Sequence, residues 1–398
     1  MQFWNLPYTG NQKHLLQILR AKPDLTRAEL VQITGLSTLT VTRYIADFIS
    51  DGIVSECGTA ESTGGRKAAK LRINPDYAYV LSLDVGTYSI KFGVVRMDGS
   101  LIHQQIVSKP PHAIPANILS VDQVRDELEK LLEQFGRKKF LGLGIGISGL
   151  VDYDTQTILF CPNIDGWNGI SVEEAFAQPL QIPVMIDTSA RCMALAEQAF
   201  GCGQQISNQV FVSIGYSIGA GIIADQKLFR GANGAAGELG HVRVEDSDEL
   251  CSCGKVGCLE LYGTLLIIQL RLGSALEEFH GFSPLRNAVD DIHHIPPEAI
   301  AQASVDGDKI VNTILSETGK LIGIALANMI NILNPELMIL GGSVIEFFPV
   351  VFEEIQRTVK EHSLVTTYRN LSIEKSTLGI NCPIIGSGMQ LIHRYFEQ

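Results

Sequence analysis

The sequence Gly237-Glu-Leu-Gly-His241 is followed, ten residues after its histidine, by Cys251-Ser-Cys253-Gly-Lys-Val-Gly-Cys258-Leu-Glu260. Three cysteines and an upstream histidine supply the soft and borderline donors of a tetrahedral zinc site. Glycines at 254 and 257 permit the tight turns that let three thiolates face one ion. Four protein ligands leave no open position for water, which favours a structural Zn²⁺ over a catalytic one. The predicted ligands are His241, Cys251, Cys253 and Cys258, and two carboxylates, Glu238 and Glu260, share the segment.

The remaining cysteines indicate a reducing compartment, and the apolar runs do not predict a membrane span. Five cysteines outside the cluster are scattered singly, which is typical of free thiols and not of a disulfide framework. No charged-then-apolar segment opens the chain, and the longest apolar run, 321–340, is interrupted by three asparagines and a proline. We therefore expect a cytoplasmic protein without membrane insertion. Its 398 residues, 45% of them hydrophobic, predict two or three domains.

Charge is distributed unevenly along the chain. Residues 1–72 contain nine Lys/Arg and six Asp/Glu, whereas the rest contains 22 and 37. A slightly basic N-terminal part on an acidic body suggests that only this part approaches a polyanion, although the excess is small.

The N-terminal pattern is that of a helix-turn-helix. Three helical patterns follow one another between residues 13 and 53, and the second begins with the capping box Thr26-Arg-Ala-Glu29. It ends at Gly35, and the next helix opens at Ser37, within about four residues. Short hydroxyls and one cation on the outward side suit contacts to phosphates and base edges. These residues are Ser37, Thr38, Thr40, Thr42 and Arg43.

A cationic β-hairpin is expected after this helix. Segments 53–57 and 69–73 read as strands around a polar tip at 58–65, and Arg66, Lys67 and Lys70 lie close to the tip. Such a wing usually contacts the DNA backbone or the minor groove. We predict that residues 1–74, here called the head, form a winged helix-turn-helix DNA-binding domain. The alternative is a helical protein-interaction module with a solvated hairpin.

Two segments of the body, 80–95 and 210–223, resemble each other as strand, glycine-containing turn and strand. This repetition predicts two duplicated lobes facing a cleft. Turns of this kind direct backbone N–H groups toward a ligand such as phosphate, but they are also common structural devices. Strands at 141–147 and 184–187, and helices at 121–135, 190–200 and 313–332, complete an α/β plan.

Several motifs act together as a signature. They are Gly64-Gly65-Arg66, Asp84-Val-Gly86, Cys161-Pro-Asn163 with Gly166-Trp167, the run Gly231–His241, the cysteine cluster, and Asn334-Pro335-Glu336 leading to Gly341-Gly342. Together they resemble the ROK family (repressors, open reading frames and sugar kinases), specifically its NagC/XylR-type winged-helix transcriptional regulators. The resemblance implies a two-lobed, actin-like (ribonuclease H-like) α/β domain over 75–398. Its first lobe would comprise about 77–189 plus a C-terminal helix at 384–398, and its second about 190–383 with the zinc site.

The resemblance also assigns a sugar site. It makes the His–Cys₃ set the zinc ligands and places Asn163, Glu238, His241 and Glu260 against sugar hydroxyls. Glu238 and His241, at i and i+3, share a face if their segment is helical. A solvated surface pair is the alternative for the two carboxylates.

The kinase pattern of the family is broken in this chain. Kinases of the family carry an Asn-Asp pair before a helix, and the Asp accepts the proton of the attacking hydroxyl; here the pair is Thr188-Ser189. A serine cannot act as this general base. Asp187 is the possible substitute, about 6–7 Å back along the strand. Tyr88 and Tyr216 add bulk to the phosphate turns, so Asp84, Gly86, Gly215 and Gly219 are expected to be vestigial.

These observations predict a non-catalytic, sugar-responsive transcription factor that acts as a repressor of carbohydrate-utilisation genes. Expected partners are double-stranded operator DNA and a sugar or sugar-phosphate effector, with assembly as a homodimer or homotetramer. A transporter protein in place of a free sugar is a further possibility. The alternative function is an ATP-dependent, glucokinase-like sugar kinase with an appended DNA-binding head.

Overall fold

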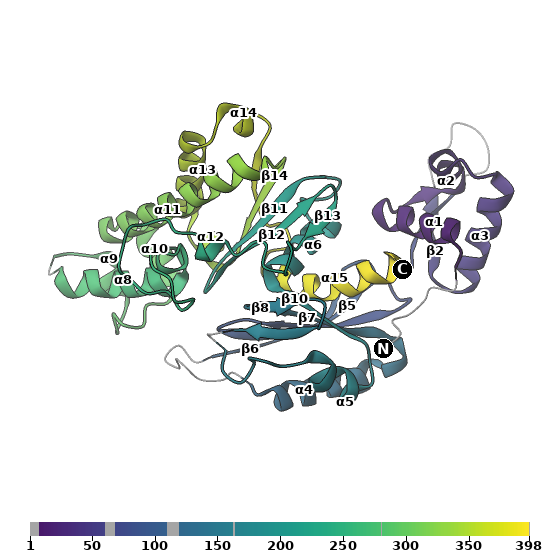
Figure 1. Ribbon diagram of the computed structural model, residues 1–398, viewed down its shortest axis with the longest axis horizontal. Helices are drawn as coiled ribbons and strands as arrows, with labels where there is room; N and C mark the ends of the chain where they lie inside the picture. The colour runs from purple at the N-terminus through teal and green to yellow at the C-terminus, as the bar shows by residue number, and fades with distance from the viewer. Residues whose placement is uncertain (1–7, 60–67, 110–118, 162–163, 280, 398) are drawn as a thin grey trace.

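The structure, a computed structural model, describes residues 8–59, 68–109, 119–161, 164–279 and 281–397. The head lies beside a larger α/β body that contains two five-stranded sheets (Figure 1). This arrangement confirms the predicted fold class of a winged helix-turn-helix followed by a two-lobed actin-like domain.

The described part of the head contains three helices and a small sheet. The helices are α1 (Gly10–Ala21), α2 (Arg27–Thr34) and α3 (Thr38–Ser50), and the strands are β1 (Leu25–Thr26), β2 (Val54–Thr59) and β3 (Ala69–Ile73), in the order β1-β3-β2. The predicted capping box is formed: Glu29 N donates to Thr26 Oγ1 over 3.3 Å, and Thr26 N donates to the Glu29 carboxylate over 2.7 Å. Gly35 ends α2 with a φ of 67°, and Ser37 Oγ caps α3 by accepting from Thr40 N. Local sequence signals therefore set both ends of the turn between α2 and α3.

The two sheets of the body repeat one topology. The first has the order β10-β7-β4-β5-β6 and the second β13-β12-β11-β14-β15. In each sheet the first three strands along the chain are antiparallel neighbours and the other two add in parallel. The first sheet, here the core of the first lobe, comprises β4 (Tyr79–Val85), β5 (Ser89–Arg96), β6 (Leu101–Ser108), β7 (Phe140–Ile147) and β10 (Val184–Thr188). The second lobe contains β11 (Gln209–Ile214), β12 (Ile218–Ala224), β13 (Lys227–Phe229), β14 (Leu337–Gly341) and β15 (Ser372–Lys375). The two similar segments, 80–95 and 210–223, thus form the first hairpin of each sheet along the chain.

Two helices lie between the sheets. Helix α6 (Ser189–Phe200) packs on β11 and β12, and α15 (Cys382–Glu397) packs on α6 and on β4 and β7 (Figure 1). The C-terminal helix therefore returns to the first-lobe sheet. Helix α6 begins one residue before the predicted 190–200 because the Thr188 hydroxyl caps it by accepting from Arg191 N over 3.4 Å. Ser189 is consequently the first residue of this helix.

Further helices cover the outer faces. Helix α4 (Val121–Phe135) has the predicted bounds and packs on the first lobe. The longest helix, α11 (Lys309–Leu333), packs on α13 (Pro349–His362) and α8 (Leu265–Glu278) of the second lobe. Among the described residues α11 alone is long and apolar enough to cross a membrane, but 56% of its apolar window is buried within the fold, as in a core helix. The remaining helices are α5 (Gln178–Leu180), α7 (Glu260–Gly263), α9 (Pro284–Ala288), α10 (Pro297–Val305), α12 (Ser343–Phe347) and α14 (Val365–Tyr368). Short elements complete the fold: β8 (Leu150–Asp152), β9 (Thr157–Phe160), the π-helix η2 (Glu173–Ala177) and the 3-10 turns η1 (Arg137–Lys139), η3 (Leu239–His241) and η4 (Gly379–Asn381).

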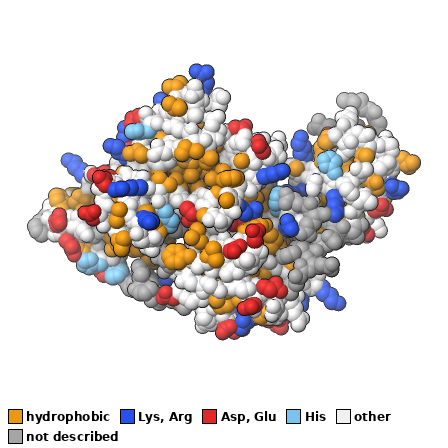
Figure 2. Space-filling model, viewed as in Figure 1, with side chains coloured by type: hydrophobic (Ala, Val, Ile, Leu, Met, Phe, Trp, Pro, Cys, Tyr) orange, Lys and Arg blue, Asp and Glu red, His pale blue; other side chains and the backbone are white. Residues whose placement is uncertain are grey.

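The head contacts the body through the C-terminal helix. Gln17 Nε2 on α1 donates to Phe396 O over 2.8 Å, and the Arg20 guanidinium lies 5.6 Å from the Phe396 ring centroid. Next to them, the hydroxyl groups of Tyr77 and Tyr395 are 3.1 Å apart. Because α15 also packs against α6 and the first-lobe sheet, one helix contacts both the head and the layer between the lobes. On the face shown in Figure 2, acidic and basic side chains are interspersed over the body.

Candidate functional site

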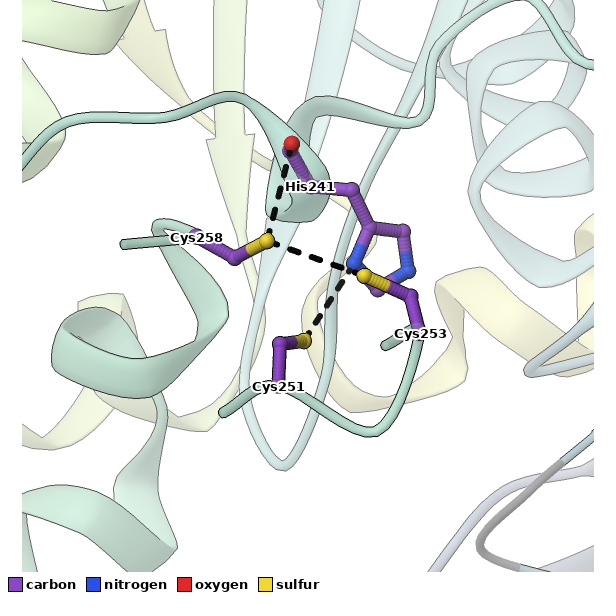
Figure 3. Close-up of side chains that lie close together, drawn as sticks. All are labelled: His241, Cys251, Cys253 and Cys258. Carbon is purple, nitrogen blue, oxygen red and sulfur yellow. Dashed lines mark hydrogen bonds between the residues drawn. The ribbon is translucent and has the colours of Figure 1, made fainter. Parts of the chain in front are cut away.

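A cluster of one histidine and three cysteines has the dimensions of a zinc site (Figure 3). His241 Nδ1 is 3.6 Å from Cys251 Sγ, and Cys253 Sγ is 3.7 Å from Cys258 Sγ. Zn–S and Zn–N bonds of about 2.3 and 2.0–2.1 Å at tetrahedral angles imply edges of about 3.6 Å (S to N) and 3.8 Å (S to S). All four donor atoms lie within 4.8 Å of one another. The donor set and its spacing therefore fit a tetrahedral zinc ion.

Backbone geometry explains the shape of this cluster. Cys251 N donates to Lys255 O and Gly254 N donates to Cys251 O, both over 2.8 Å, which closes a tight turn around Cys253. Gly254 and Gly257 have φ values of 82° and 70°. A Cβ at Gly257 would lie 2.1 Å from Glu245 O, so only glycine fits there. The predicted role of the two glycines is thus visible in the fold.

The two carboxylates of the segment are partly buried beside the cluster. Glu260 Oε2 lies 3.9 Å from His241 Nδ1. Glu260 is the first residue of α7 and lies two residues after Cys258. Burial raises the pKa of both Glu238 and Glu260, against the lowering effect of His241. This environment differs from that of a solvated surface pair. The condition for a shared helical face of Glu238 and His241 is not met, because only the 3-10 turn η3 forms and Glu238 precedes it. Asn163 lies outside the described residues.

Ser189, predicted to stand at the position of the kinase base, has a buried carboxylate as its partner. Ser189 Oγ donates to Asp84 Oδ1 over 2.6 Å, and Asp84 is almost fully buried. Burial raises the pKa of Asp84, opposed by Lys91, whose Nζ is 3.9 Å away, and by the Ser189 hydrogen bond. A Cβ on the neighbouring Gly146 would approach Asp84 Oδ1 to 3.2 Å and Ser189 Oγ to 3.4 Å. Ser189 is therefore packed against a buried carboxylate where three first-lobe strands end.

Asp187, the possible substitute base, is engaged by two arginines. Its Oδ1 pairs with Arg191 Nε, and its Oδ2 accepts from Arg230 Nε over 2.9 Å. Asp187 and Arg191 are both fully buried. Arg191 Nη1 also donates to Gly234 O over 2.6 Å, in the loop that leads to Glu238. Both carboxylate oxygens are thus ion-paired, which is the geometry of a structural anchor.

Sequence reasoning did not identify these arginines. Asp187 and Arg191 are four residues apart, the spacing of a helical ion pair, which was the available signal for one of them. No local signal marks Arg230, because it reaches Asp187 from a separate loop and stacks on Tyr153 with 3.8 Å between guanidinium and ring centroid.

The two turns that were predicted to be vestigial phosphate-binding turns form internal hydrogen bonds. Gly86 N donates to Ser89 O over 2.9 Å and Gly215 N donates to Ser217 O over 3.1 Å, so these amides already have partners. Gly219, expected in the second turn, instead lies in β12 opposite Ser213.

Four of the eight proposed DNA-contacting residues are exposed on the described part of the head. Thr38, Thr42 and Arg43 are exposed on α3, opposite its buried residues Val41 and Ile45. Leu39, 81% exposed on the same helix, was not among the predicted DNA contacts. An exposed side chain of this kind suits contact with a thymine methyl group. Ser37 is also exposed, Thr40 and Lys70 are partly buried, and Arg66 and Lys67 lie outside the described residues.

Comparisons with known proteins extend over nearly the whole chain. The winged helix-turn-helix DNA-binding pattern matches residues 9–55. The xylose repressor of Caldicellulosiruptor bescii is 29% identical over 382 residues, covering 94% of each protein. A solved ROK transcriptional regulator, a homologue of the E. coli MLC protein, superposes with a TM-score of 0.78 at 23% identity, covering 97% of this chain and 96% of that one.

A second solved structure matches the body alone. The ROK family glucokinase of Streptomyces griseus, in complex with glucose and AMPPNP, is 26% identical with a TM-score of 0.68 and covers 78% of this chain and 98% of its own. The sequence pattern of the ROK family itself matches residues 80–394, almost the entire body. This chain belongs to the ROK family.

Proposed function

We propose that this ROK protein is a sugar-responsive transcriptional repressor of carbohydrate-utilisation genes. The observation that carries the proposal is the combination of a winged head with a body whose kinase base position, Ser189, is hydrogen-bonded to Asp84. A hydroxyl in that contact does not accept a proton from a sugar near neutral pH. The resemblance to a xylose repressor along 94% of both chains supports the same function.

The sugar effector would bind beside the metal cluster. Carboxylates and imidazole recognise hydroxyl groups by hydrogen bonds, and partial burial strengthens such bonds. Because His241 Nδ1 faces Cys251, its Nε2 is the ring nitrogen available to a ligand. Zinc bound by all four donors would fix the ring orientation and supply no open position for chemistry. The proposed effector contacts are Asn163, Glu238, His241 and Glu260.

The head would bind operator DNA as part of a cytoplasmic homodimer or homotetramer. Two heads match half-sites about one helical turn apart, so their spacing controls operator affinity. Sugar binding changes that affinity only if the sugar prefers one arrangement of the lobes. Helix α15, which contacts α1 of the head as well as α6 between the lobes, is the element through which we infer that the preference reaches the head.

The test combines DNA binding with product analysis. Full-length protein is titrated onto fluorescent DNA from the region flanking its gene, with D-xylose, D-glucose or their phosphates, and the sugars are then examined for ATP-dependent phosphorylation. We expect one sugar to change DNA affinity without being phosphorylated. The kinase alternative, favoured by the likeness to the S. griseus glucokinase, requires turnover with ATP. A transporter-type protein partner is indicated instead if no sugar raises the melting temperature.

A further inference from the structure

Two tyrosines from different lobes stack face to face. Tyr88 lies in the turn between β4 and β5 of the first lobe, and Tyr216 in the turn between β11 and β12 of the second lobe. Their ring centroids are 3.7 Å apart with 20° between the planes. The tips of the two repeated hairpins therefore meet through side chains that project from equivalent turns.

Ring contact, and not hydroxyl bonding, holds this pair. The Tyr88 hydroxyl is buried and has no hydrogen-bond partner among the described residues, and burial raises the pKa of Tyr88 to about 12. Lys109 N donates to Tyr88 O over 2.9 Å, and the Lys109 ammonium lies 5.7 Å from the Tyr88 ring centroid. Tyr216 packs against the apolar core of the second lobe. Each ring is thus anchored in its own lobe while stacking on the other.

The stack occupies the place where the two glycine turns approach each other. The amides of Gly86 and Gly215 bond within their own turns. Two aromatic rings separated by van der Waals distance leave no room between them for a phosphate chain. The lobes consequently touch directly at this point.

We propose that Tyr88 and Tyr216 form a latch that holds the lobes closed without a nucleotide. The influence of the latch on sugar binding rests on the proposed function, whereas its influence on the contact between the lobes does not. The free energy of an aromatic pair is enough to change the equilibrium between open and closed lobes about 2- to 12-fold. If the sugar binds the closed arrangement, the latch supplies part of its apparent affinity by pre-closing the cleft.

Hydrogen exchange of the ligand-free, full-length protein tests the latch itself. The amides of Gly86 and Gly215 report on the two turns, and Tyr216→Leu removes the stack, whereas the matched control Tyr216→Phe keeps it. We expect Tyr216→Leu to accelerate exchange in both turns, including residues 86–89 of the other lobe, with protection of α6 unchanged. The control should exchange like the parent protein. Faster exchange confined to residues 215–217 would overturn the proposal.

A second experiment on the latch measures sugar affinity. For a sugar that binds the parent protein, Tyr88→Leu and Tyr216→Leu should each weaken binding about 2- to 12-fold, and the double variant no more than either single one. Additive losses would show two independent effects and contradict the latch. If no sugar binds the parent protein, the proposed function fails, while the exchange experiment still decides the latch.

Discussion

The hydroxyl of Ser189, at the start of α6, donates a 2.6 Å hydrogen bond to the buried carboxylate of Asp84 on β4. This contact joins two positions that the family resemblance associates with base catalysis and phosphate binding. In this chain the two side chains form a hydrogen bond with each other. The contact is therefore a packing feature of the first lobe.

Removing that hydroxyl should destabilise the protein. Ser189→Ala leaves a buried carboxylate without its donor, and hydrogen bonds to charged groups contribute about 1.5–3 kcal/mol. We expect a loss of this size in the free energy of unfolding, measured by urea denaturation. The exposed helical Ser274→Ala is the control and should change stability by less than about 0.5 kcal/mol. Equal effects of the two substitutions would contradict the structural role of Ser189.

Asp187 should behave as an anchor. Asp187→Asn leaves the fully buried Arg191 without its carboxylate, and breaking a buried ion pair typically costs about 3–5 kcal/mol. The matched control is Asp122→Asn, which removes an exposed ion pair with Arg125 and should cost no more than about 1 kcal/mol. Stability unchanged in Asp187→Asn, together with loss of an ATP-dependent activity, would instead assign a catalytic role.

Zinc removal should weaken sugar binding. We expect one zinc ion per chain by elemental analysis, and its loss in Cys253→Ser or after chelation, with a lower melting temperature and lower sugar affinity. The reason is that an ion held by this cluster would join the turn of Cys251–Cys258 to His241. Cys57→Ser, in the wing, should retain the metal. Full zinc content in Cys253→Ser would exclude this ligand set.

DNA contacts of α3 should separate into two kinds. Arg43→Ala should weaken binding to all sequences alike and reduce the slope of log affinity against log salt by about 1, as expected for one phosphate contact. Leu39→Ser should leave that slope unchanged and lower the preference for operator over unrelated DNA, because an apolar contact to a base carries no counterion release. The measurement is fluorescence anisotropy at several salt concentrations. An altered salt slope for Leu39→Ser would reject its assignment to a base.

Local signals made much of the fold predictable. The Thr26–Glu29 capping box, the Gly35 stop and the repeated hairpins are encoded by residues close in sequence, and each forms as expected. The metal cluster was predictable for the same reason, because three of its four donors lie within one short turn.

Contacts between distant segments were not predictable in this way. The stacking of Tyr88 on Tyr216 and the pairing of Arg230 with Asp187 depend on how separate loops are brought together, which no periodicity records. The tyrosines were visible in the sequence only as added bulk in turns whose bare backbone was expected to meet phosphate. Their mutual contact required the arrangement of both lobes.

The most direct test of a sensing, non-catalytic cleft is operator affinity measured with purified full-length protein and no ATP present. We predict that one sugar changes the affinity for operator DNA at least tenfold and is recovered chemically unchanged, including after later addition of ATP. Operator affinity that no sugar alters, accompanied by ATP-dependent phosphorylation of a sugar, would contradict the account.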